Sequence, residues 1–174
     1  MSQSMSRTLE ITNNFSNIEF THDKEIRPGV YLERHTGLTY SYHTRTTNLS
    51  FIATALDLKK LGIKNNKFML KIYDEGLIGV NPYDTLLPPA IANRVNLECA
   101  RNPWYYLREV SRIPEPGGAV GPGKGSPYLL NRGNLAAAWC FINNIDHYLV
   151  LPRQIGKTKS TLASILWVYL FSTS

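Results

Sequence analysis

The sequence predicts a mixed α/β fold, with an N-terminal α+β region over residues 1–89 and a second region over residues 90–174. Three observations favour this class. Short stretches rich in β-branched and aromatic residues alternate with stretches whose apolar residues recur at helical spacing. A segment with three prolines, residues 81–89, separates the two regions. In the second region a short apolar run, a tight turn and a long helical stretch follow one another.

In the first region, residues 1–20 are rich in Ser, Thr and Asn and are expected to form a loose arm. The Thr- and Tyr-rich stretch 31–47 has β character. Residues 49–61 carry apolar residues at helical spacing and are followed by Gly62, where a C-terminal cap would lie. The alternating stretch 68–73 predicts a short strand.

In the second region, Pro103 and the apolar residues after it predict a helix over about 103–112. In residues 114–127, nine of fourteen residues are Gly or Pro, which predicts a surface loop. Residues 128–142 have a helical pattern, with Gly133 as an unfavourable interior residue. The run 147–151 suits a buried strand, and residues 157–171 suit a helix after a tight turn.

The composition is that of a folded protein: 43% of the 174 residues are hydrophobic and 18% are charged. Cys99 and Cys140 cannot form a C-x-x-C pair, so we expect them to be small buried residues in a reducing compartment. We expect no signal peptide, because residues 1–10 are polar. The apolar-rich run 161–171 is much shorter than the roughly 20 residues that span a bilayer.

The net charge of +6 is uneven along the chain. Residues 1–90 hold ten basic and nine acidic residues, whereas residues 91–174 hold nine basic and four acidic ones. This excess favours a polyanionic partner such as nucleic acid, although each basic residue by itself is expected to be solvated. The basic side chains considered are Arg94, Arg101, Arg108, Arg112, Lys124, Arg132, Lys157 and Lys159.

The segment Arg153-Gln154-Ile155-Gly156-Lys157-Thr158 lies between the predicted strand and the last predicted helix. Phosphate binding uses this arrangement, because the first amides of a helix have no partner within the helix. Gly156 would allow close approach of the backbone. Lys157 would contact the β and γ phosphates, and the Thr158 hydroxyl would help to hold Mg²⁺. Compared with the pattern G-x-x-x-x-G-K-S/T, the sequence has Leu151 in place of the first glycine.

The same segment resembles the deviant Walker A motif of the large terminase subunits, the ATP-driven motors that package DNA into tailed-phage heads. The resemblance extends to Asn102-Pro103-Trp104-Tyr105-Tyr106 and to residues 130–134, and it covers residues 98–171. It implies an incomplete P-loop NTPase core made of the first strand, the P-loop and its helix. It also implies ATP and Mg²⁺ as cofactors and the cytoplasm of the infected host as the location.

By this resemblance, Arg153 and Lys157 would be the catalytic residues, with Arg153 near the γ phosphate. Residues 154–159 would bind the nucleotide, Thr158 would hold Mg²⁺, and Gln154 would shape the turn; the set is Gln154, Ile155, Gly156, Lys157, Thr158 and Lys159. In terminases a polar residue in the preceding helix contacts adenine. Here that residue would be Asn131, Arg132 or Asn134, unless these side chains simply face water.

The resemblance also implies partners for the parent protein: double-stranded DNA, the portal and the small terminase subunit, with no membrane. Hydrolysis needs a carboxylate for Mg²⁺, and no acidic residue follows Lys157. We therefore expect an N-terminal fragment of an ATPase and nuclease, without turnover by itself. Two alternatives stay open: a fragment of another P-loop nucleic-acid ATPase or helicase-like protein, and a non-catalytic binding module in which Gly156-Lys157-Thr158 is incidental.

Overall fold

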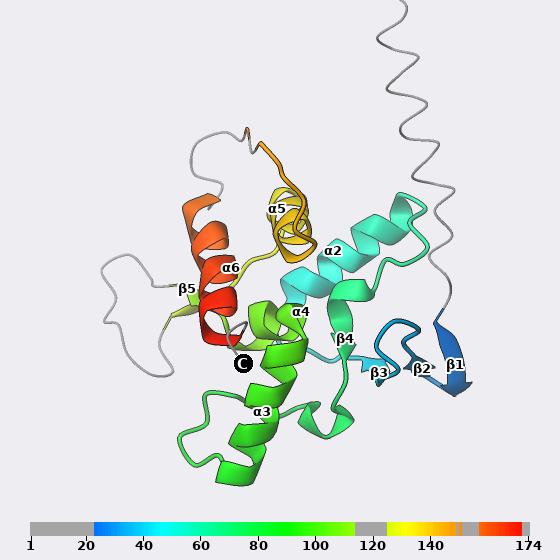
Figure 1. Ribbon diagram of the computed structural model, residues 1–174, viewed down its shortest axis with the longest axis vertical. Helices are drawn as coiled ribbons and strands as arrows, with labels where there is room; N and C mark the ends of the chain where they lie inside the picture. The colour runs from blue at the N-terminus through cyan, green and yellow to red at the C-terminus, as the bar shows by residue number, and fades with distance from the viewer. Residues whose placement is uncertain (1–22, 114–124, 149, 151–156, 172–174) are drawn as a thin grey trace, which may run out of the picture. The chain divides into compact units, whose positions relative to one another are not determined.

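The computed structural model describes residues 23–113, 125–148, 150 and 157–171. The chain divides into two compact units, residues 1–39 and 40–174. Figure 1 shows the elements in chain order, from blue at the N-terminus to red at the C-terminus. The division predicted at residues 89 and 90 falls inside the second unit.

The described part of the first unit contains a β-hairpin. Strand β1 (Lys24–Arg27) pairs antiparallel with β2 (Val30–Leu32), with Lys24 opposite Leu32. Gly29 lies in the turn with φ +78°, a conformation that favours glycine. The Glu25 carboxylate accepts a hydrogen bond of 2.8 Å from the Gly29 amide. Only the end of β2, residues 31–32, falls in the stretch 31–47 that was predicted to have β character.

Strand β3 (Thr39–Tyr42) pairs antiparallel with β4 (Lys71–Ile72), so that Ser41 lies opposite Ile72. The strand predicted over residues 68–73 is therefore only two residues long. Its first half is instead the 3₁₀ helix η1 (Phe68–Leu70). Met69 and Leu70 are both buried, and a helical turn can direct two consecutive side chains inward where a strand would alternate them.

Helix α2 (Leu49–Lys60) confirms the helix predicted over residues 49–61. It buries Phe51, Thr54 and Ala55. Gly62 follows with φ +78°, and its amide donates to the Lys59 carbonyl at 3.0 Å. Glycine therefore ends this helix as the sequence predicts.

A succession of separate helical elements forms the middle of the second unit. The 3₁₀ helix η2 (Glu75–Leu77) precedes helix α3 (Pro89–Arg101), and helix α4 (Pro103–Tyr105) continues into the π-helix η3 (Tyr106–Val110). The α4 and η3 segments confirm the helix predicted near 103–112. Helix α3 was not predicted: Pro89 was assigned to a linker, but it lies in the first turn of α3, where its missing N–H costs nothing.

The last elements follow a short antiparallel pair, β5 (Arg112–Ile113) with β6 (Ser126–Pro127). Most of the predicted Gly- and Pro-rich loop lies outside the described residues. Helix α5 (Arg132–Ile142) begins four residues later than predicted, because Asn131 caps it. Helix α6 (Lys157–Phe171) confirms that these described residues are helical.

The strand predicted over residues 147–151 was wrong for the residues that can be described. His147, Tyr148 and Val150 are not in a strand, and the last two are 100% and 92% exposed. A buried strand needs neighbours that pair with its N–H and C=O groups. The strand pairs found in the described residues are all antiparallel, and none of them includes this stretch.

Helices and aromatic side chains build the core of the second unit. The Phe68 ring packs edge-on against Trp104 and Trp139, with ring centroids 5.2 and 4.8 Å apart. Figure 1 shows helix α6 in orange to red, and this helix contacts α5 and α3. It buries Ala163, while Trp167 is half-buried against the core. In the described part of the chain, the helices are too short or too polar to cross a membrane.

Candidate functional site

Helix α6 is held on the second unit by small residues and by one indole hydrogen bond. Ser160, Ala163 and Ser164 are buried on one side of it. The Trp167 Nε1–H donates to the Cys99 carbonyl of α3 at 2.8 Å. That carbonyl lies four residues before Pro103, which has no N–H, so an indole supplies the donor that the backbone lacks. The contact fixes the position of α6 relative to α3.

The predicted phosphate loop lies at the start of α6. Arg153, Gln154, Ile155 and Gly156 lie outside the described residues. Lys157 is the first residue of α6, and Thr158 and Lys159 are exposed in its first turn. Lys157 and Thr158 therefore belong to the described part of α6, and the predicted loop before them lies outside the described residues.

The polar residues predicted to contact adenine lie at the start of α5. The Asn131 side chain accepts a hydrogen bond from the Asn134 amide at 2.9 Å and so caps the helix. Arg132 is exposed. Asn134 is buried and does not face water: its Nδ2 donates to the Leu129 carbonyl at 3.0 Å, while its Oδ1 has no hydrogen-bond partner. Within this set, Asn134 alone combines burial with an unused acceptor.

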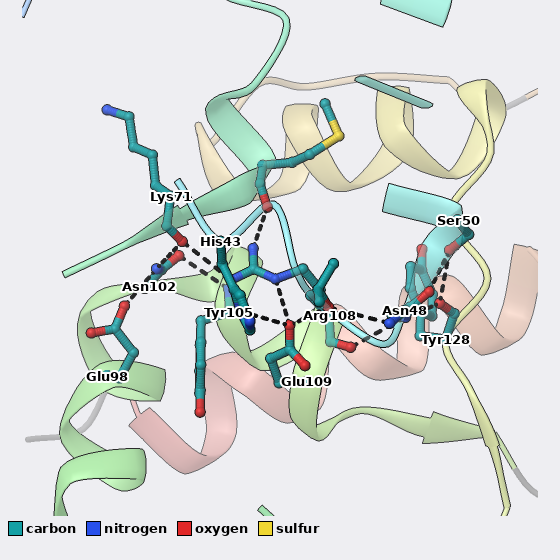
Figure 2. Close-up of polar contacts among 12 residues, drawn as sticks. His43, Asn48, Ser50, Lys71, Glu98, Asn102, Tyr105, Arg108, Glu109 and Tyr128 are labelled. Atoms are coloured by element: carbon teal, nitrogen blue, oxygen red, sulfur yellow. Dashed lines mark hydrogen bonds and ion pairs between the residues drawn. The ribbon is translucent and has the colours of Figure 1, made fainter. Parts of the chain in front are cut away.

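A buried polar network that the sequence did not predict surrounds Arg108 (Figure 2). The Arg108 side chain is fully buried. Its Nε donates to Glu109 Oε1 at 2.8 Å, its Nη2 donates to the Lys71 carbonyl at 3.3 Å, and its Nη1 donates to the Met69 carbonyl. One guanidinium thus joins the π-helix η3 to the backbone before and within β4.

The Glu109 carboxylate lies at the centre of this network. Thr46 Oγ1 donates to Glu109 Oε1 at 2.5 Å, and Nδ1 of the buried His43 lies 3.3 Å from the same oxygen. Burial by itself would raise the pKa of Glu109, but the contact with His43, the charge of Arg108 and the Thr46 hydroxyl outweigh it and lower the pKa to about 2. Glu109 is therefore a buried, ionised partner of Arg108.

A second buried carboxylate, Glu98, fixes α3 against the turn after β4. It accepts hydrogen bonds from the amides of Tyr73 and Asp74 at 2.9 and 3.0 Å, and from Asn102 Nδ2 at 2.7 Å. Asn102 Nδ2 also donates to the Lys71 carbonyl, and its Oδ1 caps α4 by accepting from the Tyr105 amide at 3.1 Å (Figure 2). These bonds satisfy buried groups at the junction between α3 and α4.

Asn48 extends the network toward α5. Its Nδ2 donates to the carbonyls of Arg108 and Tyr128, at 3.2 and 2.8 Å (Figure 2). The Leu130 amide donates to Ser50 Oγ at 3.0 Å. The segment that leads into α5 is therefore tied to the start of α2 by side-chain hydrogen bonds.

The geometry of this network supports positioning rather than catalysis. Its charged groups are buried: Arg108 donates to Glu109 and to backbone carbonyls, and Glu98 accepts from backbone amides. Burial raises the pKa of the Cys99 thiol to about 12, which keeps the thiol protonated near neutral pH. The residues described contain no group of three or more His, Cys, Asp or Glu side chains that could hold a metal ion.

The structure changes the assignment of the basic residues. Arg94 binds Asp74, with Nε 2.7 Å from Oδ2, Arg101 lies 3.2 Å from Glu98, and Arg108 is buried. The expectation that Arg108 is a solvated charge was therefore wrong. One signal in the sequence could have suggested that Arg108 is paired: it directly precedes Glu109, one of only four acidic residues after residue 90. Glu98, another of the four, also belongs to the buried network.

Comparison with known proteins adds no identification: no family model, no curated protein and no solved structure matches the chain. The features of the chain that point to a function are the sequence motif and the position of α6. Both concern the same point of the chain, Lys157.

Proposed function

We propose that the chain binds ATP and Mg²⁺ at residues 153–158, as the N-terminal part of the large terminase subunit of a tailed phage. In this proposal the second region is the beginning of a P-loop NTPase core. The observation that supports it is that Lys157 and Thr158 are in helix α6 and follow Gly156 directly in the sequence. A phosphate-binding loop needs its Gly-Lys-Thr at the first turn of a helix, because the unpaired amides there converge on the anion.

The proposed roles follow from the chemistry of each side chain. Gly156 allows the backbone to approach the phosphates, and the Lys157 ammonium neutralises the β and γ phosphates. Thr158, which is exposed in the first turn of α6, supplies a hydroxyl ligand to Mg²⁺. The Arg153 guanidinium stabilises charge on the γ phosphate.

Asn134 is the proposed contact for adenine. The adenine 6-amino group is a hydrogen-bond donor, and Asn134 Oδ1 is a buried acceptor without a partner. A buried polar atom of this kind costs free energy unless it is satisfied, so a bound base would relieve a penalty already present. Asn131 is not proposed for this role, because its side chain caps α5.

The attachment of α6 supports a preformed site. The Trp167 indole bonds to α3, and the buried serines of α6 lie against the rest of the second unit. Side chains on a fixed helix lose little conformational freedom when a ligand binds to them. The anchored position of α6 therefore favours binding at its N-terminus.

For these 174 residues the proposed activity is ATP binding, not turnover. Hydrolysis also needs a carboxylate that organises Mg²⁺, and the sequence contains no Asp or Glu after Asp146. DNA translocation, contact with the portal and small subunit, and action in the cytoplasm of the infected host are proposed for the parent motor.

The test is isothermal titration calorimetry with a non-hydrolysable ATP analogue and Mg²⁺. We expect binding by the wild-type chain, and a loss of at least about tenfold in affinity for Lys157→Ala, since each tenfold is about 1.4 kcal/mol. Lys64→Ala, which removes an exposed lysine outside the motif, is the matched control and should bind as the wild type does. Equal affinity for wild type and Lys157→Ala would contradict a phosphate site at this loop.

A further inference from the structure

The outer side of α2 carries an exposed apolar stripe that ends in basic residues. Leu49, Ala53, Leu56 and Lys60 recur at intervals of four, three and four residues, which places them on one side of a helix. Leu49 is 69% exposed and Leu56 is 53% exposed, whereas Phe51 on the opposite side is fully buried. The stripe is therefore separate from the core side of α2.

The turn that follows α2 also exposes apolar side chains and lysines. Leu61 and Ile63 are 60% and 47% exposed. Residues 49–67 contain four lysines and one acidic residue, Asp57, whose Oδ1 lies 3.3 Å from Lys60 Nζ. We name the following residues the α2 face: Leu49, Leu56, Lys59, Lys60, Leu61, Ile63, Lys64 and Lys67.

The charge of the α2 face differs from that of the arginines on α3 and η3. Arg94, Arg101 and Arg108 each have a carboxylate partner within the unit. The lysines of the α2 face are exposed and have one acidic side chain among them. The α2 face therefore presents a local positive potential to solvent, which favours a partner with negative charge.

The exposed leucines decide between two kinds of anionic partner. A nucleic-acid phosphate backbone would pair with the lysines but leave Leu49 and Leu56 in water. An acidic amphipathic helix offers apolar side chains to the stripe and carboxylates to the lysines at its end. Single exposed leucines are common on protein surfaces, but a helical stripe of them beside lysines has the pattern of a helix-docking surface.

We propose that the α2 face docks an acidic amphipathic helical segment of a partner protein. The apolar stripe of the partner packs along Leu49 and Leu56, and its carboxylates pair with Lys59 and Lys60 at the end of α2. This docking is separate from the proposed nucleotide site and does not depend on it.

The probe is a synthetic, fluorescently labelled peptide of about 18 residues, with leucines at i, i+3, i+4 and i+7 and glutamates elsewhere. Fluorescence anisotropy measures its binding to the full chain. We expect Leu49→Gln with Leu56→Gln, and separately Lys59→Gln with Lys60→Gln, each to weaken binding by at least about tenfold. These side chains are exposed, so the variants should remain folded, which circular dichroism verifies. Leu97→Gln, at a leucine of α3 that is 64% exposed, is the matched control and should bind as the wild type does.

Four results would overturn the proposal. The first is no binding of the peptide, and the second is equal binding of a scrambled peptide of the same composition. The third is binding of duplex DNA that is tighter than binding of the peptide, is abolished by the two lysine substitutions and is unaffected by the two leucine substitutions. This result would make the α2 face a nucleic-acid surface. The fourth is self-association that the leucine pair abolishes, which would make a second copy of the chain the occupant. The same variants are also titrated with the ATP analogue, which they should bind as the wild type does. Failure of peptide binding can therefore be distinguished from failure of ATP binding.

Discussion

Replacing Glu109 with glutamine should remove a large, pH-dependent part of the stability of the second unit. Glu109 is ionised and buried, and it accepts hydrogen bonds from Thr46 and Arg108. Glutamine keeps the shape of the side chain but removes the charge, which leaves the buried Arg108 guanidinium without its counter-ion. Breaking a buried ion pair from one side is costly for this reason.

The magnitude follows from the pKa of Glu109, which is lowered from 4.5 to about 2 in the folded chain. This difference corresponds to about 3 kcal/mol of stabilisation of the ionised form. Because the folded pKa lies below the unfolded one, the unfolded chain takes up the proton first as the pH falls. The stabilisation is therefore complete above about pH 5 and is lost as the pH falls through the folded pKa.

The assay is urea unfolding of wild type and Glu109→Gln at several pH values between about 7 and about 2, followed by tryptophan fluorescence. The difference in the free energy of unfolding between the two should be about 3 kcal/mol near neutral pH and should shrink toward zero near pH 2. Asp57→Asn, at an exposed carboxylate, should differ from wild type by less than about 0.5 kcal/mol. A difference between wild type and Glu109→Gln that stays constant over this pH range would refute the reasoning.

Two further predictions concern the helices that flank the proposed site. Trp167→Phe keeps an aromatic ring but removes the donor to the Cys99 carbonyl. It should therefore lower the free energy of unfolding, measured by urea titration, by about 1 kcal/mol. An unchanged urea midpoint would show that the bond contributes nothing to stability. Asn131→Ala removes the cap of α5 and should cost about 1 kcal/mol, whereas Asn131→Ser, which can still cap, should recover most of it.

The helices that the sequence predicted well are those with a local stop signal or a clear start. Gly62 ends α2 at the expected place, and the described residues 157–171 are helical as expected. The sequence predicted secondary structure wrongly where contacts with other parts of the chain determine the local conformation. Residues 68–70 form a helical turn because Met69 and Leu70 both enter the core, and the start of α5 is set by Asn131.

The candidate site was predictable only as a motif. Gly156-Lys157-Thr158 is contiguous in the sequence, and its position before a helix follows from local periodicity. The buried acceptor of Asn134 and the anchoring bond of Trp167 could not be predicted in the same way, because each depends on a partner or a surface supplied by another element.

The sequence by itself determined that residues 49–60 and 157–171 are helical. Propensity, spacing and end signals act over a few residues, so they can be seen without knowledge of the fold. Only the tertiary structure decided that Arg108 and Glu109 are buried together. Their partners, His43, Thr46 and the carbonyls of residues 69 and 71, lie tens of residues away, and burial and charge pairing exist only once the chain has brought these segments together.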